Sequence, residues 1–163
     1  MKQILVTGAV GQIGSELVLA LRKRYGASNV IASDIRVPEK GELKESGPFE
    51  TLDVLDPNSI TRIMQLYEIG TVYHLAAVLS AIGESRPGVA WQINMNGLYN
   101  FLEVSRQYHC SLFFPSSIGA FGKSTPQDGT PQDTIQRPDT IYGVTKVAGE
   151  LLCDYYHKRF NLD

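Results

Sequence analysis

The 163-residue chain has the length of about one domain of ordinary size, which leaves no room for a second. Fifteen lysines and arginines against seventeen aspartates and glutamates give a formal net charge of −2, which excludes the strongly basic surface typical of nucleic-acid binders. Hydrophobic residues make up 43% and charged residues 20% of the chain, so the composition predicts a folded core and excludes a disordered chain.

The sequence carries no pattern of a membrane span, a secretion signal or a disulfide framework. Polar residues interrupt every apolar run before it reaches the roughly 18 to 20 residues that a bilayer-spanning helix needs. The N-terminus enters a predicted strand at once, without the regions of a signal peptide. Cys110 and Cys153 lie far apart and outside any Cys-x-x-Cys motif, which argues against a disulfide or a zinc site. We therefore expect a cytoplasmic protein with no metal site and with neither nucleic acid nor a membrane as a partner.

Predicted strands alternate with predicted helices along the chain. The strands are short apolar runs, and the helices show apolar residues at helical spacing. Residues 119–140 carry several Gly and Pro residues and are predicted to form a long loop, which in a compact domain is usually functional. In chain order we expect strand 4–6, helix 12–25, strand 29–33, strand 50–53, helix 57–67, strand 71–75, helix 88–108, strand 111–115 and helix 141–160.

This alternation predicts an α/β fold with a parallel sheet, because the strand segments are too continuously apolar for a sheet with one face in water. Right-handed crossovers give a Rossmann-like, doubly wound sheet in the order 3-2-1-4-5 with helices on both faces. The helix at 88–108 is apolar on nearly every side, which predicts that the sheet covers one side of it and a second subunit the other.

Three glycines, Gly8, Gly11 and Gly14, lie in the spacing Gly-x-x-Gly-x-x-Gly between the first predicted strand and the first predicted helix. In a dinucleotide-binding turn the first permits a tight turn, the second lets the backbone approach a pyrophosphate, and the third lets the helix pack closely on the strand. The N-terminus of the helix then faces the anion. Three glycines would also suit a turn without a ligand, but their position favours dinucleotide binding, with Gln12 and Ile13 as further contacts.

Acidic residues end the second and third predicted strands. Asp34 lies twenty residues beyond Gly14, where a carboxylate can accept hydrogen bonds from an adenosine ribose and repel a 2′-phosphate. NAD is therefore favoured over NADP, although Asp34 would also suit the start of a turn and Arg36 is a cation close to the expected phosphate position. Asp53 could bind the adenine edge or start a turn, and the sequence leaves both interpretations open.

Tyr142 and Lys146 stand four residues apart in the last predicted helix, so they lie on one face of it. A free tyrosine ionises near about pH 10, so it acts as a base near neutral pH only beside a cation that favours the phenolate. Such pairs are also common on ordinary surfaces. Ser116 and Ser117 follow the fifth predicted strand at the sheet edge where doubly wound folds bind ligands, which favours a catalytic interpretation. His74 is predicted to be a core histidine with its hydrogen bonds satisfied.

Together these motifs resemble the extended branch of the short-chain dehydrogenase/reductase superfamily, which includes the nucleotide-sugar epimerases. The resemblance covers essentially the whole chain. It is carried by the glycine turn, Asp34, Asp53-Val54, Leu75-Ala76-Ala77, Asn94-Met95-Asn96-Gly97, Ser116-Ser117 and Tyr142-Gly143-Val144-Thr145-Lys146.

The resemblance implies a role for each matching residue. Tyr142 is expected to be the general base, and Lys146 to favour its phenolate while binding the nicotinamide ribose. Ser117 is expected to hydrogen-bond the reacting oxygen, and Asn94 to support a proton relay from the lysine through water. Besides the glycine turn, the residues implied to bind NAD are Asp34, Asp53, Val54, Leu75, Ala76, Ala77, Tyr142 and Lys146.

Within that branch the chain is similar to the epimerase-like L-threonine 3-dehydrogenases. The similarity lies in residues 114–122, Thr130-Pro131, Thr134-Ile135, residues 138–143 and the segment 79–84. It implies NAD-dependent oxidation of L-threonine at C3 to 2-amino-3-oxobutanoate. Ser80, Ser116, Ser117 and Tyr142 are implied to contact the substrate, although Ser80 by itself would be an ordinary loop hydroxyl.

Three hypotheses about the function stay open: this dehydrogenase, a nucleotide-sugar epimerase or dehydratase, or an NAD-binding module without catalysis. Family members continue beyond the last helix into a small lobe that covers the substrate. We therefore expect residues 1–163 to be the NAD-binding domain with the catalytic Tyr-Lys pair, without the C-terminal substrate lobe and with activity limited accordingly. The resemblance also implies a homodimer through helices 88–108 and 141–160.

Overall fold

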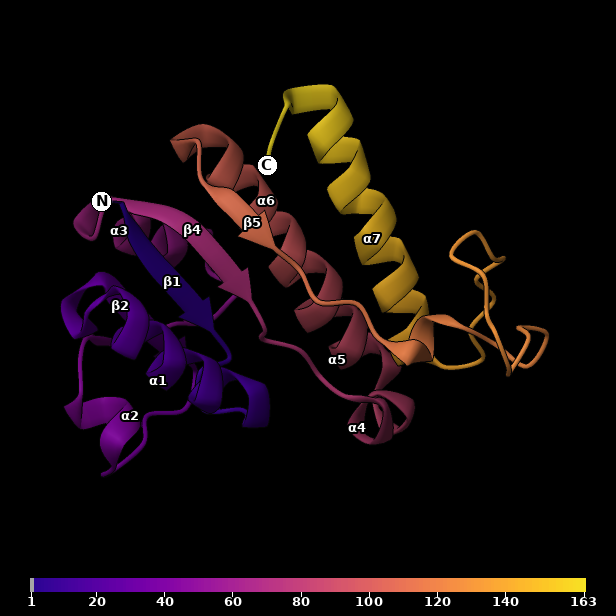
Figure 1. The fold of residues 1–163 in the computed structure, drawn as a ribbon, viewed down its shortest axis with the longest axis horizontal. Helices are drawn as coiled ribbons and strands as arrows, with labels where there is room; N and C mark the ends of the chain where they lie inside the picture. Colours follow the sequence, from indigo (N-terminus) through magenta and orange to yellow (C-terminus); the bar gives the residue numbers. More distant parts are fainter. Residues whose placement is uncertain (1) are drawn as a thin grey trace.

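Five parallel strands form one sheet in the computed structural model, which describes residues 2–163 (Figure 1). The order of the strands is β3-β2-β1-β4-β5, which confirms the predicted doubly wound α/β fold. β1 lies in the centre and pairs with β2 on one side and β4 on the other. The strands are β1 (Gln3–Thr7), β2 (Val30–Asp34), β3 (Phe49–Thr51), β4 (Ile69–His74) and β5 (Ser111–Phe113).

Helices cover both faces of this sheet. They are α1 (Gln12–Tyr25), α2 (Glu42–Glu45), α3 (Pro57–Leu66), α4 (Ser80–Ser85), α5 (Pro87–Trp91), α6 (Gly97–Tyr108) and α7 (Ile141–Phe160). α1 packs on one face through Val18 and Leu21. α3 and α6 pack on the opposite face through Ile60, Ile63 and Phe101. α7 lies along α6 and forms a further apolar cluster with it (Figure 1).

The predicted strand boundaries differ from the observed ones by no more than two residues. The strand predicted at 111–115 ends at Phe113, because β5 pairs with β4 only through its first three residues. Asn29, predicted to open the second strand, belongs to the short 3₁₀ turn Ala27–Asn29. The short helices α2 and α4 were not predicted, since four to six residues are too few to show a helical period.

The helix predicted at 88–108 is interrupted by one π-helical turn, Gln92–Asn96, between α5 and α6. π-turns inside α-helices are often found at functional sites. Here the turn contains Asn94, whose buried side chain bonds to two neighbouring segments described below. Gly97 follows the turn, and a Cβ on it would lie 2.8 Å from a methyl group of Val54, so the helix approaches the β3–α3 loop closely there.

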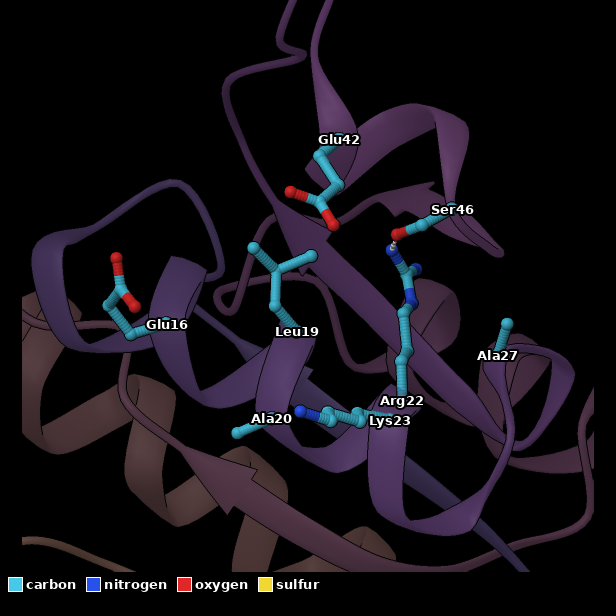
Figure 2. Close-up of a pocket in the computed structure, with 8 residues that line it drawn as sticks. All are labelled: Glu16, Leu19, Ala20, Arg22, Lys23, Ala27, Glu42 and Ser46. Carbon is cyan, nitrogen blue, oxygen red and sulfur yellow. Dashed lines mark hydrogen bonds between the residues drawn. The ribbon is translucent and has the colours of Figure 1, made fainter.

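Arg22 ties the connection between β2 and β3 to α1. Its guanidinium is buried and donates to the carbonyl oxygens of Val30, Leu43 and Pro48 over 3.3, 2.6 and 2.5 Å, and to Ser46 Oγ over 2.9 Å. Figure 2 shows the side chain pointing from α1 toward Ser46, beside an open hollow between α1 and α2. A buried cation that satisfies backbone carbonyls holds an otherwise irregular segment in place.

None of the helices in the described part of the chain combines the length and the apolar character that a membrane crossing requires. Within residues 2–163, no three or more His, Cys, Asp and Glu side chains gather where they could hold a metal ion. Cys110 and Cys153 are free thiols, the first of them buried.

Candidate active site

The glycine turn between β1 and α1 leaves room for close approach of a ligand. Gly8 has a φ of 67°, which favours glycine, and a Cβ on it would lie 2.8 Å from the Ala76 amide nitrogen. A Cβ on Gly14 would collide with the Gly8 carbonyl oxygen. No side chain caps the start of α1 at Gly11, and its first turn holds no acidic residue, so its first N–H groups can receive an anion. This arrangement fits the pyrophosphate of a dinucleotide.

Asp34 lies beside this turn, at the end of β2. Its carboxylate is buried and accepts hydrogen bonds from the Val10 amide over 3.0 Å and from the amide and Nε of Arg36 over 3.0 and 3.3 Å. A carboxylate offers about four lone-pair sites, so one of them stays available for a ribose hydroxyl. Arg36 is paired with Asp34 rather than directed to a separate phosphate position.

Asp53 and Val54 follow β3 in different environments. Asp53 is exposed, and its Oδ1 accepts from the Leu55 amide over 2.9 Å, which supports the interpretation as a turn residue. Val54 is buried, and its carbonyl oxygen accepts from the side chain of Asn100 over 3.0 Å. The contact with adenine stays a prediction for both residues.

Thr7 joins the end of β1 to the loop Leu75-Ala76-Ala77 that follows β4. Its Oγ1 accepts from the Ala76 amide over 3.2 Å and is hydrogen-bonded to His74 Nδ1 over 3.1 Å. The loop is half-buried at the edge of the glycine turn. The two loops implied to bind NAD are thus held against each other by one hydroxyl group.

His74 is buried, and its environment corrects the prediction of a fully satisfied core histidine. Only Nδ1 has a partner, since Nε2 is buried without one among the described residues. Burial, and to a smaller degree the charge of Lys146, lowers the pKa of His74 to about 3. The imidazole is therefore neutral, which avoids burying a second cation beside Lys146.

Lys146 is buried beside Tyr142 near the start of α7. Its Nζ donates to the Pro115 carbonyl oxygen over 2.8 Å and lies 4.5 Å from the ring centre of Phe114 and 5.5 Å from that of Tyr142. Burial lowers the pKa of Lys146 to about 8, against the opposing effect of the carboxylate of Glu150. A cation with this pKa is mostly protonated near neutral pH and faces the tyrosine expected to be the base.

Ser116 and Ser117 connect to different neighbours. Ser117 Oγ accepts from the Gly119 amide over 3.2 Å and caps the short 3₁₀ turn Ile118–Ala120. Gly119 in turn packs on the Tyr142 ring, because a Cβ on it would lie 3.2 Å from a ring carbon. Ser116 donates to the carboxylate of Glu150 on α7 instead. Gly119 therefore links Ser117 to the Tyr142 ring, and the substrate contacts of Ser116 and Ser117 stay predictions.

Asn94 connects three segments of the site by hydrogen bonds. Its Oδ1 accepts from the Val78 amide over 2.7 Å, and its Nδ2 donates to the Val78 carbonyl over 3.0 Å and to Thr145 Oγ1 over 3.1 Å. Thr145 Oγ1 donates to the Tyr142 carbonyl over 2.8 Å. Asn94 thus contacts the neighbour of Lys146 rather than Lys146 itself, and the proton relay through water stays a prediction.

Ser80 is the exposed first residue of α4. Glu84, on the same helix, accepts a hydrogen bond from the Ile141 amide over 2.8 Å at the start of α7. Gly83 also approaches Ile141, because a Cβ on it would lie 3.2 Å from a methyl group there. These contacts hold α4 against the end of α7 that carries Tyr142.

Several residues that shape the site were not predicted from the sequence. Glu150 could have been noticed, because it stands four residues after Lys146 on the same helix face. Thr7, Glu84, Phe114 and Thr145 give no local signal, since each acts on a segment far away in the chain.

Comparison with known proteins places this site in a family. The sequence model of the NAD dependent epimerase/dehydratase family matches residues 4–163. The chain belongs to this family. An uncharacterised epimerase/dehydratase of Staphylococcus saprophyticus is 55% identical over 163 residues, which cover 100% of this chain and 51% of that protein.

Solved structures of two enzymes have the same fold. L-threonine dehydrogenase from Clostridium difficile is 58% identical with a TM-score of 0.97, over 100% of this chain and 51% of that one. UDP-glucose 4-epimerase from Thermus thermophilus, in complex with NAD, is 30% identical with a TM-score of 0.86, over 98% of this chain and 52% of that one. The chain spans about half the length of these relatives. The prediction of NAD as the cofactor is confirmed at the level of the family, and the glycine turn and Asp34 fit it.

Proposed function

We propose that the protein carrying these residues is an NAD-dependent L-threonine 3-dehydrogenase that oxidises the C3 hydroxyl of threonine to give 2-amino-3-oxobutanoate. The observation that carries this proposal is the buried Lys146 cation beside the Tyr142 ring, next to a turn suited to a dinucleotide. The substrate is suggested by the identity of 58% to the Clostridium difficile threonine dehydrogenase, against 30% to the UDP-glucose epimerase. Because the chain spans about half of either relative, residues 1–163 are proposed as the NAD-binding domain, and a substrate lobe would lie in the rest of the protein.

Tyr142 is the proposed general base for the C3 hydroxyl proton. The Lys146 ammonium favours the phenolate, because it is held 5.5 Å from the ring centre and is only weakly hydrated. Ser117 would donate its hydroxyl hydrogen to the reacting oxygen, while its lone pair accepts from the Gly119 amide. NAD, when bound, supplies the acceptor for the hydride that leaves C3.

The first test replaces Tyr142 by Phe, which keeps the ring that packs on Gly119 and removes the hydroxyl group. Threonine-dependent formation of NADH by the natural-length protein should fall by about 10²- to 10⁴-fold, the usual contribution of a general base. The affinity for NAD, measured by titration calorimetry, should change by less than about threefold, since the glycine turn and Asp34 are untouched. Retained turnover would rule out Tyr142 as the base.

The second test distinguishes the substrate classes. The natural-length protein, without substitutions, is mixed with NAD and either L-threonine or UDP-glucose, and the absorbance of NADH is followed. A rise with threonine alone supports the dehydrogenase. Conversion of UDP-glucose without net NADH, detected by chromatography of the sugar nucleotide, would support an epimerase in its place. Binding of NAD without turnover of either compound would support the third hypothesis, an NAD-binding protein without catalytic activity.

A further inference from the structure

Glu150 connects three parts of the candidate active site. It lies one helical turn beyond Lys146 on α7 and is half-buried. One of its carboxylate oxygens accepts from Ser116 Oγ, and the other accepts from Gln136 Nε2 over 3.0 Å. Ser116 precedes Ser117 in the loop after β5, and Gln136 belongs to the irregular segment 121–140. A single carboxylate therefore joins the serine loop and the long loop to the helix that carries Tyr142 and Lys146.

The charge of Glu150 also acts on Lys146. Residues four apart on a helix are neighbours, and a carboxylate there opposes the effect of burial on the pKa of the lysine. Among the other groups that face Lys146, the Pro115 carbonyl and the Phe114 ring come from the loop after β5 and carry no charge, and His74 of β4 is neutral. The Tyr142 ring, 5.5 Å away on the same helix, supplies a negative charge only as the phenolate.

Further along α7, Glu150 is itself faced by Cys153 and Asp154. Burial, together with the charges of Asp154 and Glu150, raises the pKa of Cys153 to about 11, so the thiol is uncharged near neutral pH. Asp154 is exposed and pairs with Lys158 over 3.7 Å. Asp154 is thus a second carboxylate on the same helix that makes neither of the contacts of Glu150, which makes it a matched control.

We propose that Glu150 is a positioning residue of the Tyr142–Lys146 site: it holds Ser116 and Gln136 against α7 and keeps a negative charge one helical turn from the Lys146 ammonium. The link to catalysis rests on the proposed function, because a protonated Lys146 is useful only if Tyr142 is the base. The electrostatic effect of Glu150 on Lys146 does not rest on the proposed function, since it is measured on this chain without cofactor or substrate.

The experiment on the 163-residue chain measures the ionisation of Lys146 directly. The chain is labelled with ¹³C-lysine, the Lys146 signal is assigned by its loss in Lys146→Met, and its chemical shift is followed against pH by NMR. Glu150→Gln removes the charge but keeps the shape, so the Lys146 midpoint should move down by about half a pH unit or more. Asp154→Asn should move it by less than half of that amount. An unchanged midpoint in Glu150→Gln, or equal shifts in the two variants, would overturn the proposal.

Glu150→Asp separates charge from position. It keeps the carboxylate but shortens the side chain, so the Lys146 midpoint should stay close to that of the unchanged chain. The contacts with Ser116 and Gln136 should weaken, and amide hydrogen exchange at the hydrogen-bonded Gly119 and Ala120, which follow Ser116 in the same loop, should quicken several-fold. Unchanged exchange there would contradict the structural half of the proposal. This variant also provides a folded comparison if Glu150→Gln unfolds.

The catalytic consequence is tested with the natural-length protein. Loss of activity at high pH should follow deprotonation of Lys146, so the alkaline limb of the kcat/KM profile should move to lower pH in Glu150→Gln in step with the NMR midpoint. If the Lys146 midpoint shifts in Glu150→Gln but the alkaline limb of the kcat/KM profile does not, the role of Glu150 in turnover is refuted. Absence of turnover in the unchanged protein would instead count against the proposed function and leave the Lys146 titration as evidence for the electrostatic link.

Discussion

Burial of the Lys146 ammonium lowers the stability of the fold but suits the role proposed for this residue. A fall of its pKa from 10.5 to about 8 on burial corresponds to roughly 3 kcal/mol against the charged form. Below pH 8 the lysine is charged in both the native and the unfolded chain, so this cost is constant. Between about 8 and 10.5 the native chain releases the proton first, and the free energy of unfolding rises with pH. The site therefore keeps a cation that folding alone would disfavour.

His74 gives a pH dependence of the same sign at lower pH, and this is a testable prediction. Burial lowers its pKa from 6.5 to about 3, so below pH 6.5 the unfolded chain binds a proton that the native chain does not. The free energy of unfolding should therefore rise with pH between about 3 and 6.5 and be lost as the pH falls, with a contribution from His74 that approaches about 1.4 kcal/mol per pH unit.

The measurement is urea unfolding of the unchanged chain and of His74→Leu at several pH values from about 7 to about 5. At pH 7 His74→Leu should be less stable than the unchanged chain, because Thr7 loses a hydrogen-bond partner. Its dependence on pH should nevertheless be flatter, since the titrating ring is gone. Parallel curves for the two proteins would show that His74 does not control the acid sensitivity.

At the scale of elements, the crossover from β2 to β3 depends on Arg22 more than on its own helix. α2 has only four residues, so the segment gains little from helical hydrogen bonds. The Arg22 guanidinium instead donates to three backbone carbonyls, of which that of Pro48 also accepts from the Ala32 amide over 3.1 Å. This segment starts at Asp34, so Arg22 also helps to hold the part of the candidate site where the adenosine is expected to bind.

Arg22→Met should therefore lower the free energy of unfolding by about 2–4 kcal/mol, because the four hydrogen bonds of the buried guanidinium are lost. Lys23→Met is the matched control: Lys23 borders the same hollow (Figure 2) and is exposed, so its loss should cost less than about 0.5 kcal/mol. Urea denaturation of both variants provides the comparison. Equal effects would mean that Arg22 does not secure the crossover.

The π-turn at Gln92–Asn96 is an element that the sequence could not reveal. Apolar spacing predicts one continuous helix over 88–108, and most of that segment is indeed helical. The turn is stabilised by contacts of Asn94 with Val78 and Thr145, which lie 16 and 51 residues away in the chain. Such long-range bonds override a local helical period because each satisfies a buried polar group.

At the scale of the whole molecule, α5, α6 and α7 leave large apolar side chains exposed. Trp91, Tyr99 and Tyr155 are 45%, 50% and 53% exposed. Exposed aromatic residues are typical of protein interfaces, so the homodimer implied by the sequence stays our prediction for this face. Tyr99→Glu should weaken self-association by about tenfold or more in sedimentation equilibrium.

Tyr25→Glu, on α1 and away from this face, should leave association unchanged. A chain that is monomeric at every concentration before any substitution would contradict the predicted dimer.

The sequence by itself determined the sheet and the tight glycine turn after β1, because both depend on local patterns. Apolar strands alternating with helices allow few topologies once crossovers are right-handed, and the observed order matches the expected one. The spacing of the glycines and their position between β1 and α1 predict a tight turn, and the conformation of Gly8 and the close contacts of Gly8 and Gly14 confirm it.

Only the tertiary structure decided how the candidate site is held together. Ser116 and Ser117 are neighbours in sequence, yet one bonds to Glu150 and the other lies by Tyr142. The spacing of Tyr142 and Lys146 shows that they share a face, but not that the lysine is buried against Pro115 and Phe114. The burial and the charge of a site depend on segments that are distant in the chain and meet only in the folded protein, so the sequence does not reveal them.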